Sequence, residues 1–156
     1  MNNKETPLNR PIIALSGGFN PARKTHIAMI LEASKIGDVV IILNSDKWCI
    51  ERSWNGQLFS VYENRKSVLE KIPGVTRVVP ASDDDGTVCK TLEEIQPDYF
   101  GNGGIRTIIN TPEVDFCKKN GIGLVWYLGD SSDETTLEMA DLYLQIAIAQ
   151  VYGNDS

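Results

Sequence analysis

The sequence predicts a single α/β domain of Rossmann-like architecture, in which a five-stranded parallel sheet carries helices on both faces. Strand-like and helix-like segments alternate along the chain, which is typical of parallel sheets. The length of 156 residues fits one domain, and we expect it to span residues 1–156. Residues 38–44, DVVIILN, form a run that is apolar on both faces, as a strand covered by helices on each side requires.

Five short segments rich in aliphatic residues are expected to be the strands. Each is followed by a segment with helical spacing, and glycine, proline or polar residues separate the two kinds of segment. Because strands and helices alternate, all five strands should run parallel. The expected strands are residues 11–16, 38–44, 76–80, 98–102 and 122–128.

Capping residues and helix breakers predict where the helices begin and end. Ser60 and Glu63 have the spacing of a capping box, and Pro73 and Gly74 end the helix that they begin. The helix expected at residues 87–95 must stop before Pro97. The next helix has Thr111 as its cap and Pro112 in its first position. The expected helices are residues 25–36, 60–71, 87–95, 112–120 and 134–152.

The charge balance excludes some classes of partner. The chain has 15 Lys and Arg against 21 Asp and Glu, a net charge of −6 and a pI of about 4.8. An acidic chain of this kind is a poor binder of nucleic acid and of anionic membranes, so we expect neither as a partner. One local basic pocket for a small phosphate ligand is compatible with this balance.

The cysteines and the N-terminal residues indicate a compartment. Cys49, Cys89 and Cys117 are widely spaced, and a single histidine cannot complete a Cys/His zinc set. Three reduced thiols fit a reducing compartment. Residues 1–10 are expected to be flexible, and they lack the apolar core of a signal peptide. The longest aliphatic run, residues 39–43, is far shorter than a membrane span, and we therefore expect a cytoplasmic protein.

The segment after the first strand carries the groups of a phosphate site. Residues 16–26 read SGGFNPARKTH. Two glycines at a strand end let the backbone approach a ligand, and the next helix presents free N–H groups and a positive dipole end. Arg23, Lys24 and His26 add cationic groups around that end. The structural alternative is a tight turn with a solvated Arg and Lys and a capping Thr25, and neither Walker-A nor G-x-G-x-x-G spacing is present.

This stretch resembles the signature of the nucleotidyltransferase superfamily of cytidylyltransferases and related adenylyltransferases. That signature is Gly-x-Phe-[Asp/Asn]-Pro-x-His-x-Gly-His, and it is matched at Gly18, Phe19, Asn20, Pro21 and His26. Further motifs follow in the family's order: NSDKW at 44–48, ENRKSVLEKIPGVTRVVP at 63–80, NGGIR at 102–106 and NTPE at 110–113. The set resembles glycerol-3-phosphate and sugar-phosphate cytidylyltransferases most, while the Phe-Asn-Pro spelling leaves adenylyltransferases open.

The resemblance implies a reaction and a set of site residues. It implies transfer of CMP from CTP, with Mg²⁺, to a small phosphorylated alcohol or sugar, with release of pyrophosphate. Catalysis would rest on positioning and charge stabilisation, with His26, Arg23 and Lys24 as the catalytic residues. Asn44 and Asp46 would lie near the acceptor. The nucleotide would contact Gly17, Gly18, Phe19, Asn20, Arg65, Gly103, Gly104, Arg106, Thr135 and Thr136.

Some of these roles have a structural alternative. Arg65 and Arg106 can instead be ion-pair partners on the surface, and Asp46 can cap a short helix. The tryptophans can serve packing rather than stacking. The acidic run at residues 83–85 is expected to be a solvated loop end.

Several positions depart from the family pattern. Arg23 stands at a histidine position of the signature, Thr25 stands at a glycine position, and Ile105 replaces an acid. Losing one preorganised donor typically costs on the order of 10²–10³ in rate. The turn at residues 129–136, GDSSDETT, keeps its hydroxyls but adds acids that satisfy the helix dipole and repel a triphosphate. The alternative function is therefore a catalytically degenerate nucleotide-binding or regulatory homologue.

The last expected helix is apolar over much of its circumference from Leu137 onward. It either covers the edge of the sheet or is shared with a second subunit. Because the family often pairs, we favour a homodimer.

Overall fold

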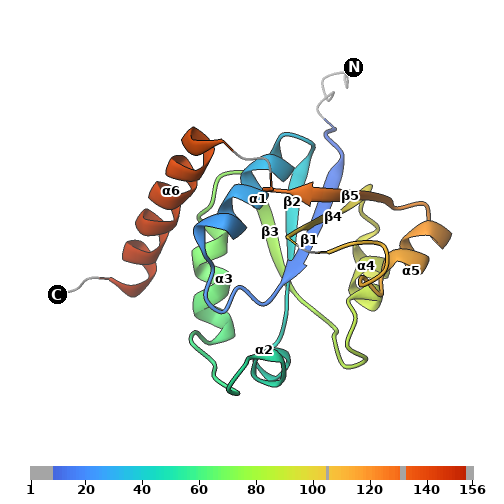
Figure 1. Cartoon of the computed structure of the whole chain (residues 1–156), viewed down its shortest axis with the longest axis horizontal. Helices are drawn as coiled ribbons and strands as arrows, with labels where there is room; N and C mark the ends of the chain where they lie inside the picture. Colours follow the sequence, from blue (N-terminus) through green and yellow to red (C-terminus); the bar gives the residue numbers. More distant parts are fainter. Residues whose placement is uncertain (1–8, 105, 131–132, 154–156) are drawn as a thin grey trace.

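The computed structural model describes residues 9–104, 106–130 and 133–153, and its centre is a parallel sheet of five strands (Figure 1). The strands are β1 (Ile12–Gly17), β2 (Asp38–Leu43), β3 (Val75–Pro80), β4 (Tyr99–Gly103) and β5 (Gly123–Leu128). The helices are α1 (Lys24–Ser34), α2 (Asp46–Arg52), α3 (Tyr62–Glu70), α4 (Cys89–Ile95), α5 (Val114–Lys119) and α6 (Glu134–Tyr152). None of the described helices is long and apolar enough to cross a membrane.

The expected fold class is confirmed. The strand order is β3-β2-β1-β4-β5, and each neighbouring pair is parallel. β1 is therefore the central strand, and the direction of strand addition reverses between β1 and β4. In open α/β sheets this reversal leaves a crevice beyond the carboxyl ends of the strands, where ligands bind.

Two apolar cores, one on each face of the sheet, hold the layers together. The larger core joins α1, α3 and α6 to one face and includes Ile13, Leu15 and Ile41. The smaller core joins α4 and α5 to the other face and includes Ala14, Ile42 and Phe100. Successive residues of β1 and β2 thus enter opposite cores, which explains why both strands are apolar throughout.

Helix α6 forms an outer layer. It packs against α1 and α3, and Figure 1 shows it on the side of these helices away from the sheet. Of the two alternatives left open for this helix, covering the sheet edge does not describe its main packing, which is on α1 and α3. Its buried side chains are Ala140, Leu144 and Ala147, while Leu142 and Ile146 are 55% and 47% exposed.

Helix boundaries differ from the sequence prediction where side chains have other partners. α3 begins at Tyr62 without a side-chain cap, because its cap position is Val61, which has no polar side chain. The expected cap, Ser60, instead shares a hydrogen bond of 2.6 Å with the Tyr152 hydroxyl. α5 begins at Val114, one short turn after the expected cap at Thr111. α2 was not among the expected helices, and its cap is Ser45 rather than Asp46, with the Ser45 hydroxyl accepting from the Trp48 N–H.

A buried arginine ties together the loops at the carboxyl end of the sheet. Arg65 on α3 is 2% exposed. Its Nε donates to the Ser60 carbonyl at 2.8 Å, and its Nη1 donates to the carbonyls of Gly18 and Asn44 at 2.7 and 2.9 Å. Its Nη2 pairs with the Asp46 carboxylate at 2.5 Å. One guanidinium thus joins the loop after β1, the loop after β2 and the start of α3.

Asn20 also bonds the segment that precedes α3. Its Oδ1 accepts from the N–H groups of Phe59 and Ser60 at 2.7 and 3.1 Å. Its Nδ2 donates to the Gln57 carbonyl at 3.2 Å. The signature loop therefore holds the irregular segment between α2 and α3.

Replacing Arg65 by methionine should destabilise the fold. Arg65→Met leaves buried carbonyl groups without donors and removes the partner of Asp46, which should lower the free energy of unfolding by about 3 kcal/mol. Urea unfolding followed by circular dichroism measures this. Lys66→Met is the matched control, because Lys66 forms only a 3.9 Å surface pair with Glu70 and should cost under about 1 kcal/mol. Equal losses in the two variants would contradict a central role for Arg65.

Candidate functional site

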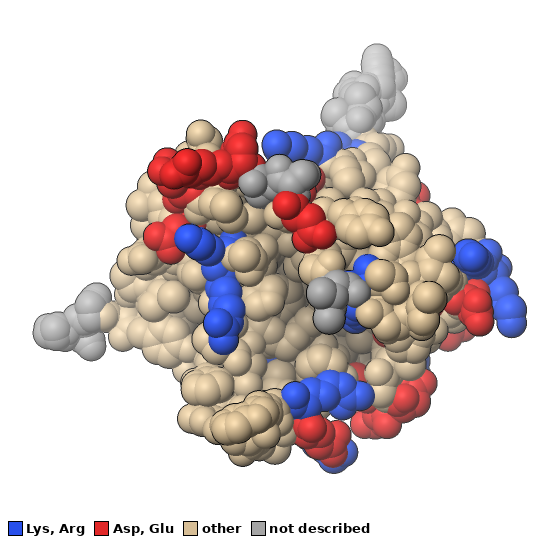
Figure 2. Space-filling model, in the orientation of Figure 1, with Lys and Arg blue, Asp and Glu red and all other residues tan. Residues whose placement is uncertain are grey.

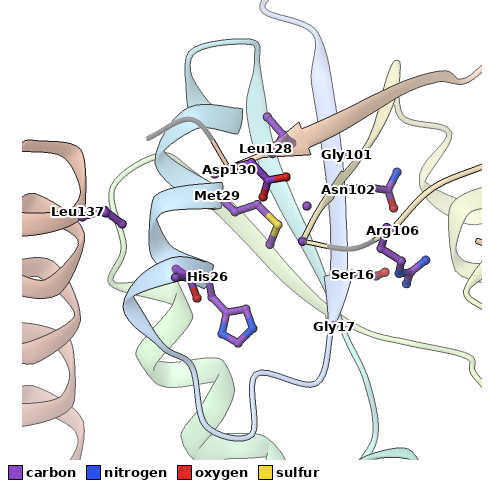
Figure 3. Close-up of a pocket in the computed structure, with 14 residues that line it drawn as sticks. Ser16, Gly17, His26, Met29, Gly101, Asn102, Arg106, Leu128, Asp130 and Leu137 are labelled. Atoms are coloured by element: carbon purple, nitrogen blue, oxygen red, sulfur yellow. The ribbon is translucent and has the colours of Figure 1, made fainter. Parts of the chain in front are cut away.

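A pocket of about 680 Å³ opens at the carboxyl ends of β1, β4 and β5 (Figure 3). It lies at the reversal of strand order, where the fold predicts a ligand site. The N-terminal part of α1 and the residues after β5 close its sides. Its lining comprises Ser16, Gly17, Thr25, His26, Met29, Gly101, Asn102, Gly103, Gly104, Arg106, Leu128, Gly129, Asp130 and Leu137.

Glycines in β4 make the floor of this pocket. A Cβ on Gly103 would lie 2.5 Å from the Leu128 carbonyl oxygen, and one on Gly101 would lie 2.6 and 2.7 Å from side-chain carbons of Leu128 and Leu15. Real Cβ atoms do not approach this closely, so β4 and β5 can lie together here only because side chains are absent. Gly104 has φ of +63°, a conformation that glycine adopts at little cost.

His26 presents one defined ring nitrogen to the pocket. The backbone N–H of Arg23 donates to His26 Nδ1 at 3.0 Å. In the neutral ring the proton therefore sits on Nε2, which becomes a hydrogen-bond donor. The Phe19 ring packs edge-on at 5.0 Å between centroids. Burial, and secondly the positive charge of Arg23, lower the pKa of His26 from its usual 6.5.

Arg106 lies on the opposite side of the β1 carboxyl end from His26 (Figure 3). It lines the main pocket and also a second pocket of about 240 Å³, which shares Ser16 and Gly17. Its Nη1 is 3.7 Å from Oε1 of Glu113, a residue that is 3% exposed. The other Glu113 oxygen accepts from the Val88 N–H at 3.0 Å. The two pockets therefore meet at one arginine.

The two residues expected near the acceptor are held by protein partners. Asn44 lines the second pocket, and its Nδ2 donates to Asp83 at 3.0 Å. Asp83 also accepts from the Ser45 N–H and hydroxyl at 3.1 and 3.2 Å. Asp46 pairs with Arg65. The expectation of a solvated loop end is therefore wrong for Asp83, which supports the loop after β2.

The structure brings together part of the expected site. Gly17, His26, Gly103, Gly104 and Arg106 line the main pocket. The remaining expected catalytic and nucleotide-contacting residues line neither it nor the second pocket. They are Gly18, Phe19, Asn20, Arg23, Lys24, Arg65, Thr135 and Thr136.

These residues have other surroundings. The side chains of Arg23 and Lys24 are exposed. A Cβ on Gly18 would lie 3.0 Å from the Cys49 sulfur, so this glycine lets α2 pack against the first loop. Phe19 is buried with φ of +47°. The backbone N–H of Thr136 donates to the Asp133 side chain at 2.8 Å.

Sequence reasoning missed several lining residues. Met29 follows His26 by three positions on α1, and this helical spacing could have placed it on the same face. Asn102 and Glu113 belong to motifs noted in the sequence, but nothing there indicated that either faces a pocket. Leu137 enters from α6, and only the packing of α6 on α1 brings it there.

The acidic turn lies beside the main pocket. Asp130 lines it, and Asp133 caps α6. Hydrogen bonds from the backbone and side chain of Thr136 lower the pKa of Asp133, so the cap stays ionised. Figure 2 shows a hollow near the middle of this face, with acidic side chains above it and basic ones beside and below it. The departure at Ile105 and the retained hydroxyls of Ser131 and Ser132 lie outside the described residues.

Known proteins resemble the chain in both sequence and fold. "Bifunctional protein HldE" of Blochmanniella floridana is 29% identical over 107 residues, covering 66% of this chain and 22% of that protein. HldE of Haemophilus influenzae strain PittEE is 30% identical over 94 residues, 60% of this chain and 19% of the relative. "FAD synthase" of Aciduliprofundum boonei is 24% identical over 110 residues, covering 70% and 72%. The resemblance to the cytidylyltransferase-like nucleotidyltransferase superfamily is confirmed.

The similarity to this superfamily is uneven in extent. The chain spans about a fifth of the length of the HldE relatives that it matches. The lipopolysaccharide core biosynthesis protein from Thermoplasma volcanium GSS1 has the same fold, with a TM-score of 0.61 and 20% identity, covering 75% of this chain and 95% of that one. No protein-family model matches the chain.

The partly buried His26, whose pKa is lowered, should make the stability of the fold depend on pH. Its folded pKa is below 6.5, so the unfolded state takes up the proton first as the pH falls. The neutral His26 ring therefore makes its full contribution to the free energy of unfolding above pH 6.5. That contribution is lost as the pH falls toward the pKa of His26 in the folded state. We expect the free energy of unfolding to fall more between about pH 7.5 and about pH 5.5 in the wild type than in His26→Asn.

Urea unfolding at the two pH values measures this difference. His26 is the single histidine of the chain, so no other histidine obscures the comparison. Asparagine keeps an acceptor for the Arg23 N–H but does not titrate. Parallel pH profiles in the two proteins would contradict the lowered pKa.

Proposed function

We propose that this chain transfers a nucleoside monophosphate from a nucleoside triphosphate to the phosphate of a small acceptor, releasing pyrophosphate. The observation that carries the proposal is the Nε2–H of His26, which is fixed by the Arg23 backbone and faces a pocket at the strand-order reversal. The similarity to the nucleotidyltransferases supports the same class of reaction.

The chemistry would be an in-line displacement. An oxygen of the acceptor phosphate attacks the α-phosphorus, a new P–O bond forms, and the bond between the α-phosphorus and the bridging oxygen breaks. His26 Nε2–H would donate to an α-phosphate oxygen as charge develops there, and Arg106 would stabilise negative charge from the other side. The side chains of Arg23 and Lys24, expected from the sequence to be catalytic, would act at the pocket rim.

Mg²⁺ would enter with the triphosphate. Such ions usually bind through substrate phosphates and one or two carboxylates, and Asp130 supplies a carboxylate on the pocket lining. No group of three or more Cys, His, Asp and Glu suited to a metal ion occurs in the described part of the chain. Bound there, the ion would neutralise phosphate charge, which would offset the repulsion expected from the acidic turn.

Two donor nucleotides are candidates. The ordered motif set favours CTP, with CMP transferred to a phosphorylated alcohol or sugar. The FAD synthase relative, of which the chain covers 72%, and the Phe19-Asn20-Pro21 spelling support ATP. Both nucleotides therefore enter the same assay.

A catalytically degenerate nucleotide-binding or regulatory protein is the second candidate. Two observations favour it: the chain has a single histidine, and Asp130 lines the pocket where phosphate charge would collect. It predicts weak nucleotide binding without turnover. We also propose a cytoplasmic location, which the free thiols of Cys49, Cys89 and Cys117 support.

We further propose a homodimer formed by α6. Met139, Leu142 and Ile146 are 43%, 55% and 47% exposed, and their spacing of three and four residues lines them up as one stripe. All charged residues of the helix, Glu134, Glu138 and Asp141, lie in its first half. An antiparallel pair about a two-fold axis would set each acidic half against the partner's uncharged half.

Pyrophosphate release tests the proposed reaction. With CTP or ATP, Mg²⁺ and a panel of sugar and polyol phosphates, the wild type should release pyrophosphate. His26→Ala should lower kcat by about 10²–10³-fold while circular dichroism stays unchanged. Lys35→Ala, at the far end of α1, is the control and should keep wild-type rates. A folded wild type that is inactive with both nucleotides would contradict the proposal and favour the degenerate homologue.

Light scattering tests the dimer. The wild type should have twice the monomer mass. Leu142→Asp should dissociate the dimer, because it would bury an unpaired carboxylate at the two-fold contact. Ile109→Asp is the control, since Ile109 is 96% exposed and lies between β4 and α5, away from α6 in the sequence. A wild type of monomer mass at all concentrations would contradict the proposal.

A further inference from the structure

We propose that the second pocket binds the acceptor, and that Glu113 selects acceptors carrying a hydroxyl group close to the phosphate. The inference rests on the proposed function and adds a specificity-determining residue to it. The pocket of about 240 Å³ is lined by Asn44, Trp48, Arg52, Arg106 and Glu113, among others. It meets the main pocket at Arg106, so an acceptor bound in it would reach a nucleotide held beside His26.

Glu113 is held in place by one oxygen, while the other has an ion-pair partner but no hydrogen bond. It is 3% exposed, and its Oε2 accepts from the Val88 N–H. Its Oε1 is buried and has no hydrogen-bond partner among the described residues, and the same holds for Nη1 of Arg106. A buried polar group without a partner is costly. Glu113 Oε1 and Arg106 Nη1 are therefore a hydrogen-bond acceptor and a hydrogen-bond donor fixed 3.7 Å apart, and each is available to a ligand.

Such a pair fits a ligand with a donor beside an acceptor. Arg106 Nη1 would donate to a phosphate oxygen, and Glu113 Oε1 would accept from a neighbouring hydroxyl. A phosphate without a hydroxyl satisfies only one of the two groups. A polyol phosphate satisfies both.

The charges around the pocket favour a hydroxyl over an ammonium group. Arg106 already balances Glu113. Arg52 adds a second positive charge, held 4.6 Å from the centre of the Trp48 ring. The lining therefore has a net positive charge, which attracts a phosphate dianion and opposes a ligand cation. The small volume limits the acceptor to a few carbons.

Equilibrium binding tests the inference without requiring turnover. Calorimetry would compare glycerol phosphate with n-propyl phosphate, which has the same three carbons but no hydroxyl. The wild type should bind glycerol phosphate about tenfold tighter or more. In Glu113→Gln, which keeps an oxygen for the Val88 N–H but turns an amide toward Arg106, this preference should vanish. Asp115→Asn, an exposed carboxyl on α5, should keep it.

Each outcome decides the inference. Equal binding of the two phosphates by the wild type overturns it, and so does an unchanged preference in Glu113→Gln. Tighter binding of ethanolamine phosphate than of glycerol phosphate also overturns it, because Glu113 would then select a cation. If Glu113→Gln does not fold, the wild-type preference alone decides. Binding of glycerol phosphate with that preference, but without pyrophosphate release, would instead contradict the proposed reaction.

Discussion

The buried guanidinium of Arg65 is the interaction on which the carboxyl edge of the sheet depends. The cores position the strands, but they leave the loops after β1 and β2 irregular, with carbonyl groups that need donors. Arg65 donates hydrogen bonds to the carbonyls of Ser60, Gly18 and Asn44, and it pairs with the carboxylate of Asp46. The rigid planar shape of the group allows it to serve several loops at once. Both pockets are built on the strand ends that these loops follow.

The sequence predicted the fold well because the decisive signals are local. Apolar runs and helix breakers located the five strands and most helices. The short α2 appeared only as an alternative, a short helix capped by Asp46, because its seven residues are too few for a periodic pattern. The position of α6 was left open, since the same apolar face suits a sheet edge, other helices or a second subunit, and only packing decides.

The site was predicted less completely, because residue type does not say which way a side chain points. Arg65 and Arg106 are both arginines in family motifs, yet Arg65 faces inward and Arg106 lies between two pockets. Asn20 and Asp46 have protein partners that are distant in sequence. The orientation of Glu113 depends on a hydrogen bond from Val88, at the start of α4. The two residues are 25 positions apart in the sequence, and no local pattern reveals such a contact.

The hydrogen bond from the Arg23 backbone to His26 has a consequence for which residues can stand at position 23. The donor is a main-chain N–H, which every residue except proline has. The proton of the neutral imidazole is therefore placed on Nε2 whatever side chain stands at position 23. Exchanging histidine for arginine there can alter charge at the rim while the geometry of the donor is inherited unchanged. Proline is the one genetically encoded residue that would remove this hydrogen bond, because it has no backbone N–H.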